Sequence, residues 1–207
     1  MKLLYVEASP LKNASHSISV AAAFLEAYQQ AHPQDEIDRI DVWSEPLPPF
    51  DGRTIEAKFA VLRLQQFTQE QFQRWDAVRQ VSKRFNAADK YVFSVPMWNF
   101  GIPYALKHYI DVVTLPGENW KWSRARGYET LLSGKKALLI YTSANDYTQA
   151  ANPMSDFQKP YMRRWLRFIG VEDVQEISVA PTLADPAAVA QSRTAAIREA
   201  TELATSF

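Results

Sequence analysis

The sequence predicts an α/β fold in which a five-stranded parallel sheet is doubly wound, with helices on both faces. Two observations support this prediction: five short apolar segments rich in β-branched and aromatic residues, and helical apolar patterns between them. Strands that alternate with helices are joined by right-handed crossovers, which makes the sheet parallel. For such a sheet we expect the strand order 2-1-3-4-5. The 207-residue chain, 47% hydrophobic, is expected to form one domain over residues 1–207.

The predicted strands differ in how continuous their apolar character is. The first, third and fourth are almost entirely apolar, as expected of strands buried on both faces of a sheet. The second and fifth alternate apolar and polar residues, so we expect them nearer the sheet edges. In chain order the strands are Leu3–Val6, Ile37–Val42, Tyr91–Val95, Ala137–Thr142 and Val174–Val179.

Helices are predicted wherever apolar residues recur three and four positions apart. The last helix begins at Asp185, a good N-cap residue that is followed by a proline at the first helical position. Two long segments, Ser44–Asp51 and Pro116–Ser133, are expected to be irregular, and long loops are usually functional or disordered. The helical apolar faces comprise Ile18, Ala22 and Leu25; Val78, Val81 and Phe85; Leu106, Ile110 and Val113; Tyr161, Trp165 and Phe168; and Val189, Ala196, Ile197, Ala200 and Leu203.

The composition excludes several classes of function. The chain has no cysteine, which excludes disulfides, thiolate catalysis and cysteine-ligated metal centres. Its 23 basic and 23 acidic residues balance to zero, so nothing indicates binding to nucleic acid or to an anionic membrane. No apolar stretch is long enough for a signal peptide or a membrane span, and we expect a soluble, cytoplasmic protein. His16, His32 and His108 are scattered, so no metal site is predicted.

The loop after the first strand has the composition of an anion site. It reads SPLKNASHS and contains Ser9, Asn13, Ser15 and Ser17. Free N–H groups and the dipole at the following helix N-terminus favour a phosphate there. The loop matches neither the dinucleotide-binding fingerprint nor the P-loop, because it contains no glycine. A serine-rich loop that only caps the helix is an equally open interpretation.

The segment after the third strand could hold a flat heteroaromatic ring. Trp98, Asn99, Phe100 and Gly101 combine apolar surface, an amide and a backbone that a ligand can approach closely. In a doubly wound sheet, ligands bind outside the carboxyl ends of the strands, which is where this segment emerges. The alternative is a turn whose aromatic residues belong to the core.

The fourth strand ends at the same edge in another polar turn. Ser143, Asn145 and Asp146 follow the strand directly, and Asn and Asp favour turns through local hydrogen bonds. The turn is therefore either part of the same site or an ordinary connection. No G-x-S-x-G motif is present, which argues against a serine hydrolase.

These segments, taken in order, resemble one known family. The serines after the first strand, PMWNFGIPYALKHYIDVV after the third, LPGENWKW and the paired lysines before the fourth resemble the FMN-dependent NADH-azoreductases, also called FMN-dependent NADH:quinone oxidoreductases. The resemblance spans nearly the whole chain and implies a flavodoxin-like fold and a homodimer with two active sites at its interface. It also implies an FMN site in which Ser9, Ser15, His16 and Ser17 hold the phosphate, Met97, Trp98, Asn99, Phe100 and Gly101 line the ring, and Ser143, Ala144, Asn145 and Asp146 close over the flavin edge.

The substrate side is also implied by the resemblance. Trp120 matches an aromatic position that the partner subunit contributes over the substrate face of the flavin, where Phe100 also lies. The chain departs from the family in the turn Ser143–Asp146, where Ser-Arg-Gly-Gly is usual, and in Asn119–Trp120, where Thr-Phe is common. These departures affect residues at the flavin edge and beside the substrate.

No side chain has the features of a dedicated nucleophile or general acid, which suits chemistry carried by a cofactor. We therefore expect NADH or NADPH to reduce FMN, and a quinone or azo compound to be reduced by two electrons in a ping-pong cycle. Two other classes stay open: a flavodoxin-like electron carrier without its own substrate, and a binding or regulatory protein on the same fold. Flavodoxins are usually strongly acidic, whereas this chain is neutral.

Overall fold

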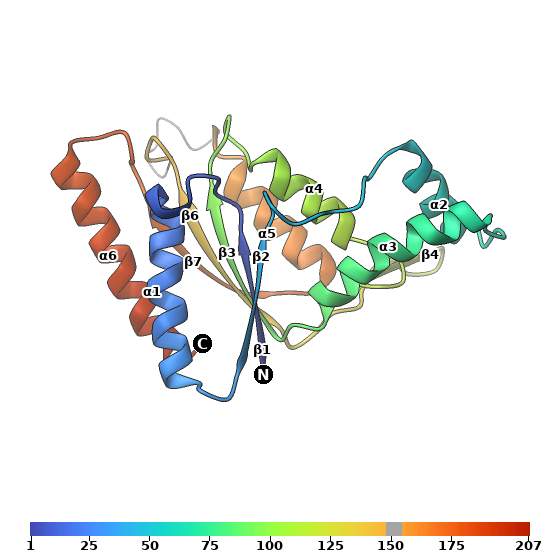
Figure 1. Ribbon diagram of the computed structural model, residues 1–207, viewed down its shortest axis with the longest axis horizontal. Helices are drawn as coiled ribbons and strands as arrows, with labels where there is room; N and C mark the ends of the chain where they lie inside the picture. The colour runs from blue at the N-terminus through green and yellow to red at the C-terminus, as the bar shows by residue number, and fades with distance from the viewer. Residues whose placement is uncertain (148–154) are drawn as a thin grey trace.

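The computed structural model describes residues 1–147 and 155–207 (Figure 1). Its main sheet has five parallel strands in the order β2-β1-β3-β6-β7. Counted within this sheet, that is the predicted order 2-1-3-4-5, with the alternating second and fifth strands at the edges. The strands are β1 (Lys2–Glu7), β2 (Glu36–Asp41), β3 (Lys90–Pro96), β6 (Lys136–Thr142) and β7 (Asp173–Val179).

Helices cover both faces of this sheet, as predicted (Figure 1). One face carries α1 (His16–Ala31) and α6 (Pro186–Ala204), and its core includes Phe24 and Tyr28. The other face carries α3 (Gln69–Asn86), α4 (Tyr104–Val113) and α5 (Gln158–Ile169) around Phe93, Tyr109 and Trp165. Within the described ranges, no helix combines the length and apolar character needed to cross a bilayer.

The elements that were not predicted include one helix and one β-hairpin. Helix α2 (Gly52–Leu62) packs on α3, where Ala57 joins Trp75 and Val78 in a small separate cluster. The segment Pro116–Ser133, expected to be irregular, contains an antiparallel hairpin of β4 (Trp120–Ser123) and β5 (Gly127–Thr130). That expectation was wrong because the hairpin strands are short and carry long aromatic and charged side chains that resemble a loop composition. Segment Ser44–Asp51 contains neither helix nor strand, as expected.

Candidate functional site

The carboxyl ends of β1, β3 and β6 lie side by side along the border of the sheet at which these strands end, the upper border in Figure 1. We call this border the carboxyl edge, as distinct from the edge strands. The chain leaves β1 toward β2 on one side and leaves β3 toward β6 on the other. This edge is therefore the topological switch point, where doubly wound sheets open a crevice for ligands. The three polar loops singled out from the sequence all emerge here.

The first loop ends in a group of buried hydroxyls at the N-terminus of α1. Ser9, Ser15 and Ser17 are exposed by only 1%, 5% and 0%. Ser15 is the N-cap residue: its Oγ accepts a hydrogen bond from Ile18 N at 3.4 Å and lies 3.1 Å from Ser17 Oγ. His16, the first residue of the helix, is half-buried. Helix capping and a hydroxyl-rich anion site thus coexist in one loop.

The second loop is a tight turn that holds two aromatic rings out of the core. Trp98 N donates to Gly101 O at 3.0 Å, and Gly101 N donates to Trp98 O at 2.9 Å. Asn99 and Phe100 have φ angles of 46° and 70°, a left-handed conformation that is unusual for a bulky residue and that clusters at binding sites. Trp98 is 38% exposed and Phe100 is 51% exposed, so the interpretation of both as core residues fails. Met97, half-buried beside them, donates its N–H to Thr142 O at 2.7 Å.

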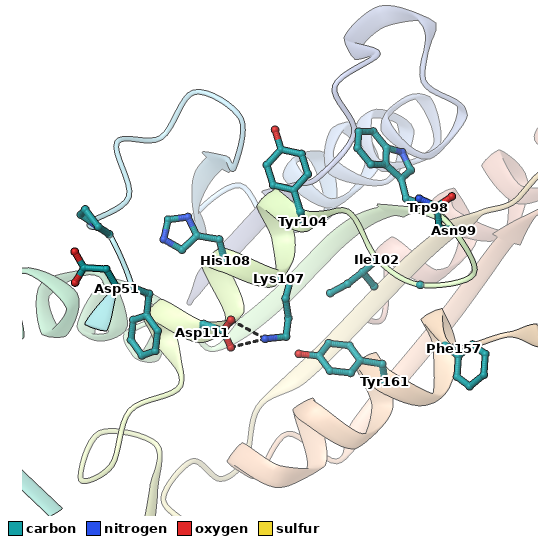
Figure 2. Close-up of a pocket in the computed structure, with 13 residues that line it drawn as sticks. Asp51, Trp98, Asn99, Ile102, Tyr104, Lys107, His108, Asp111, Phe157 and Tyr161 are labelled. Atoms are coloured by element: carbon teal, nitrogen blue, oxygen red, sulfur yellow. Dashed lines mark hydrogen bonds and ion pairs between the residues drawn. The ribbon is translucent and has the colours of Figure 1, made fainter. Parts of the chain in front are cut away.

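A largely apolar cavity of about 950 Å³ opens beside this turn. Trp98, Asn99, Gly101 and Ile102 line one end, and the loop that contains Asp51 lines the other (Figure 2). Its volume lies within the range of small-molecule and cofactor sites, and a flat tricyclic ring fits such a space. Phe100 is not among the lining residues; its ring packs edge-on to Tyr147, with 6.5 Å between the ring centroids.

One face of α4 forms a wall of this cavity that the sequence analysis missed. Tyr104, His108 and Asp111 lie at helical spacing along that wall (Figure 2). Lys107 Nζ forms an ion pair with Asp111 at 2.6 Å, and His108 Nε2 lies 3.0 Å from Pro48 O. The four- and three-residue spacing of these residues is a signal that the sequence contains, on a different face of the helix from its apolar residues.

The far wall is formed by Phe157 and Tyr161, which were also missed as site residues. Burial raises the pKa of Tyr161 to about 12, so its phenol stays protonated at neutral pH and can donate a hydrogen bond. Across the described part of the chain, no group of three or more His, Cys, Asp or Glu side chains is arranged to hold a metal ion.

The described part of the third loop, Ser143–Tyr147, is anchored but does not line this cavity. Ser143 Oγ donates to Asn145 O at 2.8 Å, and the backbone oxygens of Ser143 and Ala144 accept from Thr182 N and Leu183 N. Ser143, Ala144 and Asp146 are half-buried and Asn145 is exposed. The turn shares the sheet edge with the two other loops, and contacts to the segment after β7 fix its position.

Trp120 does not line the cavity beside the turn Trp98–Gly101 of its own chain. It is 8% exposed and packs against Tyr128 and Phe168, with ring centroids 5.6 and 5.7 Å away. Together these rings line a second cavity, of about 470 Å³. The two cavities are separate but share Phe50 and Asp111 in their walls.

Trp43 is a further aromatic residue at the sheet edge that the sequence analysis missed. Its indole Nε1 donates to Ala8 O at 3.0 Å, which fixes it beside the end of β1. Its ring lies 5.4 Å from that of Trp98 and 5.2 Å from that of Tyr104. Trp43 therefore connects the first loop to the aromatic turn, a contact between distant segments that has no local sequence signal.

Comparisons with known proteins identify the fold and the family. Residues 1–204 match a protein family described as having a flavodoxin-like fold. An FMN-dependent NADH:quinone oxidoreductase of Desulfotalea psychrophila is 42% identical over 98% of this chain and 96% of that protein. The azoreductase of Bacillus anthracis strain Sterne has a similar structure, with a TM-score of 0.91, 26% identity and full coverage of both chains.

A solved FMN-dependent NADH-azoreductase of Bacillus anthracis strain Ames Ancestor, in complex with FMN, is also similar. It has a TM-score of 0.87 and 28% identity, and the match covers 99% of this chain and 97% of that one. These matches span the whole fold, including the three loops at the sheet edge. The chain therefore belongs to the family of FMN-dependent NADH:quinone oxidoreductases.

Proposed function

We propose that the protein binds FMN at the carboxyl edge of its sheet and uses NADH to reduce quinones, azo compounds or both. One observation carries the proposal: buried hydroxyls at the N-terminus of α1 and an exposed aromatic turn meet at the switch point, next to a cavity of about 950 Å³. Family membership supports the same reading, because quinone reductases and azoreductases both occur among the similar proteins.

The donor set suits a phosphate monoester. The hydroxyls of Ser9, Ser15 and Ser17, together with the first backbone N–H groups of α1, offer neutral hydrogen bonds in a buried place. His16 can add a further donor from the same helix end. Since an anion is stabilised at a helix N-terminus, this set requires no lysine or arginine on the phosphate itself.

The ring would lie along the turn from Met97 to Gly101, with the turn Ser143–Asp146 at its edge. The left-handed backbone at Asn99 and Phe100 holds their side chains outside the core, where Asn99 can give fixed amide hydrogen bonds. Trp98, supported by Trp43, offers a flat apolar surface. The turn after β6 here reads Ser-Ala-Asn-Asp and contains no arginine, so its hydrogen bonds would come from short polar side chains and the backbone.

When bound, FMN supplies the two-electron redox chemistry that protein side chains lack. The protein's own residues bind and orient the reactants. The apolar walls of the cavity favour a planar aromatic reactant, and Phe157 and Tyr161 reduce the contact of this reactant with water. One shared cavity implies that donor and acceptor occupy it in turn, in a ping-pong order. Tyr161, protonated at neutral pH, is the side chain on the far wall that can donate a hydrogen bond to a reduced acceptor.

The active form is proposed to be a homodimer in which Trp120 approaches the site of the partner subunit. Trp120 Nε1 is buried and has no hydrogen-bond partner among the described residues. Trp122 and Tyr128, on the same face of the hairpin, are 57% and 66% exposed. Large exposed aromatic surfaces are typical of interaction sites, and a second copy of the chain would cover this one. Light scattering on the FMN-loaded protein measures the assembly directly.

The donor is proposed to be NADH, with NADPH as the alternative that initial rates would separate. Lys121 and Arg126 of the hairpin are the cations that could bind the 2′-phosphate of NADPH. They lie 3.8 and 3.3 Å from Glu129, so both already form an ion pair with the same carboxylate. A cytoplasmic location is part of the proposal, supported by the dependence on NADH and by the absence of cysteine.

Anaerobic addition of NADH to the FMN-loaded protein tests the function. The visible flavin absorbance should bleach without any acceptor and return when a quinone or azo dye is added. A flavin that stays oxidised with both NADH and NADPH would contradict the proposal. Bleaching by NADH without steady turnover of any quinone or azo dye would instead favour an electron carrier.

A further inference from the structure

We propose that Lys12 is a positioning residue that holds the phosphate-binding loop in place through a bridge to Glu7 and Asp41. The inference rests on the proposed FMN site and goes beyond it, because it assigns a role to Lys12, a residue of the loop that is not part of the proposed phosphate donor set. The bridge connects the carboxyl ends of β1 and β2 to the short 3-10 turn, Lys12–Ala14, that leads into α1.

The two carboxylates of the bridge are brought together by the sheet register. Glu7 at the end of β1 is directly opposite Asp41 at the end of β2. Like charges in such a pair repel each other, and a cation between them removes the repulsion. Lys12 Nζ lies 2.6 Å from Glu7 Oε1 and 2.6 Å from Asp41 Oδ2. The lysine charge is thereby committed to these two carboxylates.

The backbone at Lys12 shows why the loop needs this support. Lys12 has a φ of 48°, a left-handed conformation usually left to glycine, and the loop contains no glycine. Its carbonyl accepts from Ser15 N at 2.9 Å, so the position of Lys12 determines that of the helix N-cap. Strain of this kind persists only where surrounding contacts impose it, and the double ion pair is such a contact.

Asp41 also makes two hydrogen bonds that do not involve Lys12 and that remain in its variants. Its carboxylate also accepts from Trp43 N at 3.1 Å and from Ser44 Oγ at 2.7 Å, and Trp43 packs on Trp98. Burial by itself lowers the pKa of Lys12, but hydrogen bonds to Asp41 and Glu7 outweigh burial and raise the pKa above its ordinary value. Burial by itself raises the pKa of Asp41, but the hydrogen bonds from Lys12 and Ser44 outweigh burial and bring this pKa below its ordinary value. The Lys12 ammonium and the Asp41 carboxylate therefore stay charged at neutral pH.

Three variants of Lys12 separate the bridge from the backbone strain. Lys12→Met removes the bridge and keeps a side chain that is strained at positive φ. Lys12→Gly removes the bridge and the strain together, and Lys12→Arg keeps a cation that can span both carboxylates. The matched control is Lys2→Met, since Lys2 Nζ lies 3.3 Å from both Glu36 and Asp38 at the opposite end of the same two strands.

The experiment measures dissociation constants of FMN and of riboflavin by flavin fluorescence, and thermal unfolding of each apo-protein. Riboflavin has the ring but lacks the phosphate, so it reports on the aromatic half alone. We expect Lys12→Met to weaken FMN binding about tenfold, which corresponds to about 1.4 kcal/mol, and to leave riboflavin binding unchanged. Lys12→Gly should fall between Met and wild type, Lys12→Arg should restore binding, and Lys2→Met should bind both flavins as wild type does.

Several results would overturn the inference. Wild-type FMN affinity in Lys12→Met or in Lys12→Gly would mean that the bridge does not position the loop. Equal weakening of FMN and riboflavin, or no recovery with arginine, would indicate a general structural defect instead. If the wild-type protein does not bind FMN, the proposed function is refuted as well. If the wild-type protein binds FMN tightly and Lys12→Met has the same dissociation constant, only this inference is refuted.

Discussion

Replacing Ser17 with alanine should weaken FMN binding while leaving the fold almost unchanged. Ser17 is fully buried in the first turn of α1, and its Oγ lies 3.1 Å from Ser15 Oγ. The N-cap hydrogen bond is made by Ser15 and survives the substitution. The lost hydroxyl therefore acts mainly on the ligand, and the helix keeps its cap.

The magnitude follows from the kind of hydrogen bond that is lost. A hydroxyl that donates to a charged phosphate contributes about 1.5–3 kcal/mol. The dissociation constant of FMN should therefore rise roughly 10- to 150-fold, because 1.4 kcal/mol corresponds to a factor of ten. Riboflavin, which has no phosphate, should bind with unchanged affinity.

The assay is fluorescence titration of the apo-protein with FMN, with Ser82→Ala as the control. Ser82 is also fully buried, and its Oγ donates to Val113 O at 2.7 Å, away from the sheet edge. The control should lower the unfolding temperature and leave FMN affinity intact. Wild-type affinity in Ser17→Ala, or equal weakening in the control, would refute the placement of the phosphate at α1.

Other consequences can be measured separately. Asn99→Ala should reduce NADH:quinone turnover and leave the fold intact, because Asn99 is exposed beside the cavity; unchanged steady-state kinetics would exclude it from the site. Gly170→Ala should cost about 2–5 kcal/mol in urea unfolding, since Gly170 has a φ of 100° and a Cβ there would lie 2.1 Å from Leu132 O. A smaller loss would mean that the backbone moves to make room. Asp38→Asn should lower stability by about 1 kcal/mol at neutral pH, because Arg84 donates to both carboxylate oxygens, at 2.7 and 3.0 Å, and lowers the pKa of Asp38. Because the pKa of Asp38 is lower in the folded state, its carboxylate stabilises the fold at pH values above its pKa in the unfolded chain, and this stabilisation is lost as the pH falls through its pKa in the folded protein. The wild type and the variant should therefore become equally stable in acid. A difference in stability that persists there would exclude the carboxylate charge as its origin.

The five strands were predictable because their signal is local. A strand buried on both faces is a short, nearly continuous apolar segment of the sequence. Tyr91–Val95 is such a segment, and it was recognised as a strand from its composition alone. Helix α2 was missed because its buried residues are small: Thr54, Ala57 and Ala60 make contact without forming an apolar stripe. Its N-cap is Asp51, whose Oδ1 accepts from Thr54 N at 3.0 Å, and that start signal was available.

The site was predictable to the extent that it follows from strand order. Once β1, β3 and β6 are neighbours, the loops with Ser15, Trp98 and Ser143 must share an edge. Trp43 and Phe157 could not be found in this way, since their positions depend on how distant segments pack. Trp120 lines a cavity separate from that of Trp98, so its role over the flavin stays a prediction that depends on the proposed homodimer.

The edge strand β2 has a consequence for aggregation. An unpaired strand edge exposes N–H and C=O groups to which another chain can add. Four of the six residues in β2 (EIDRID) are charged, and Lys2 and Arg84 engage Glu36 and Asp38 beside it. Charged side chains of both signs along this border disfavour strand addition from a neighbouring molecule and discourage growth into fibrils, even in a protein with zero net charge.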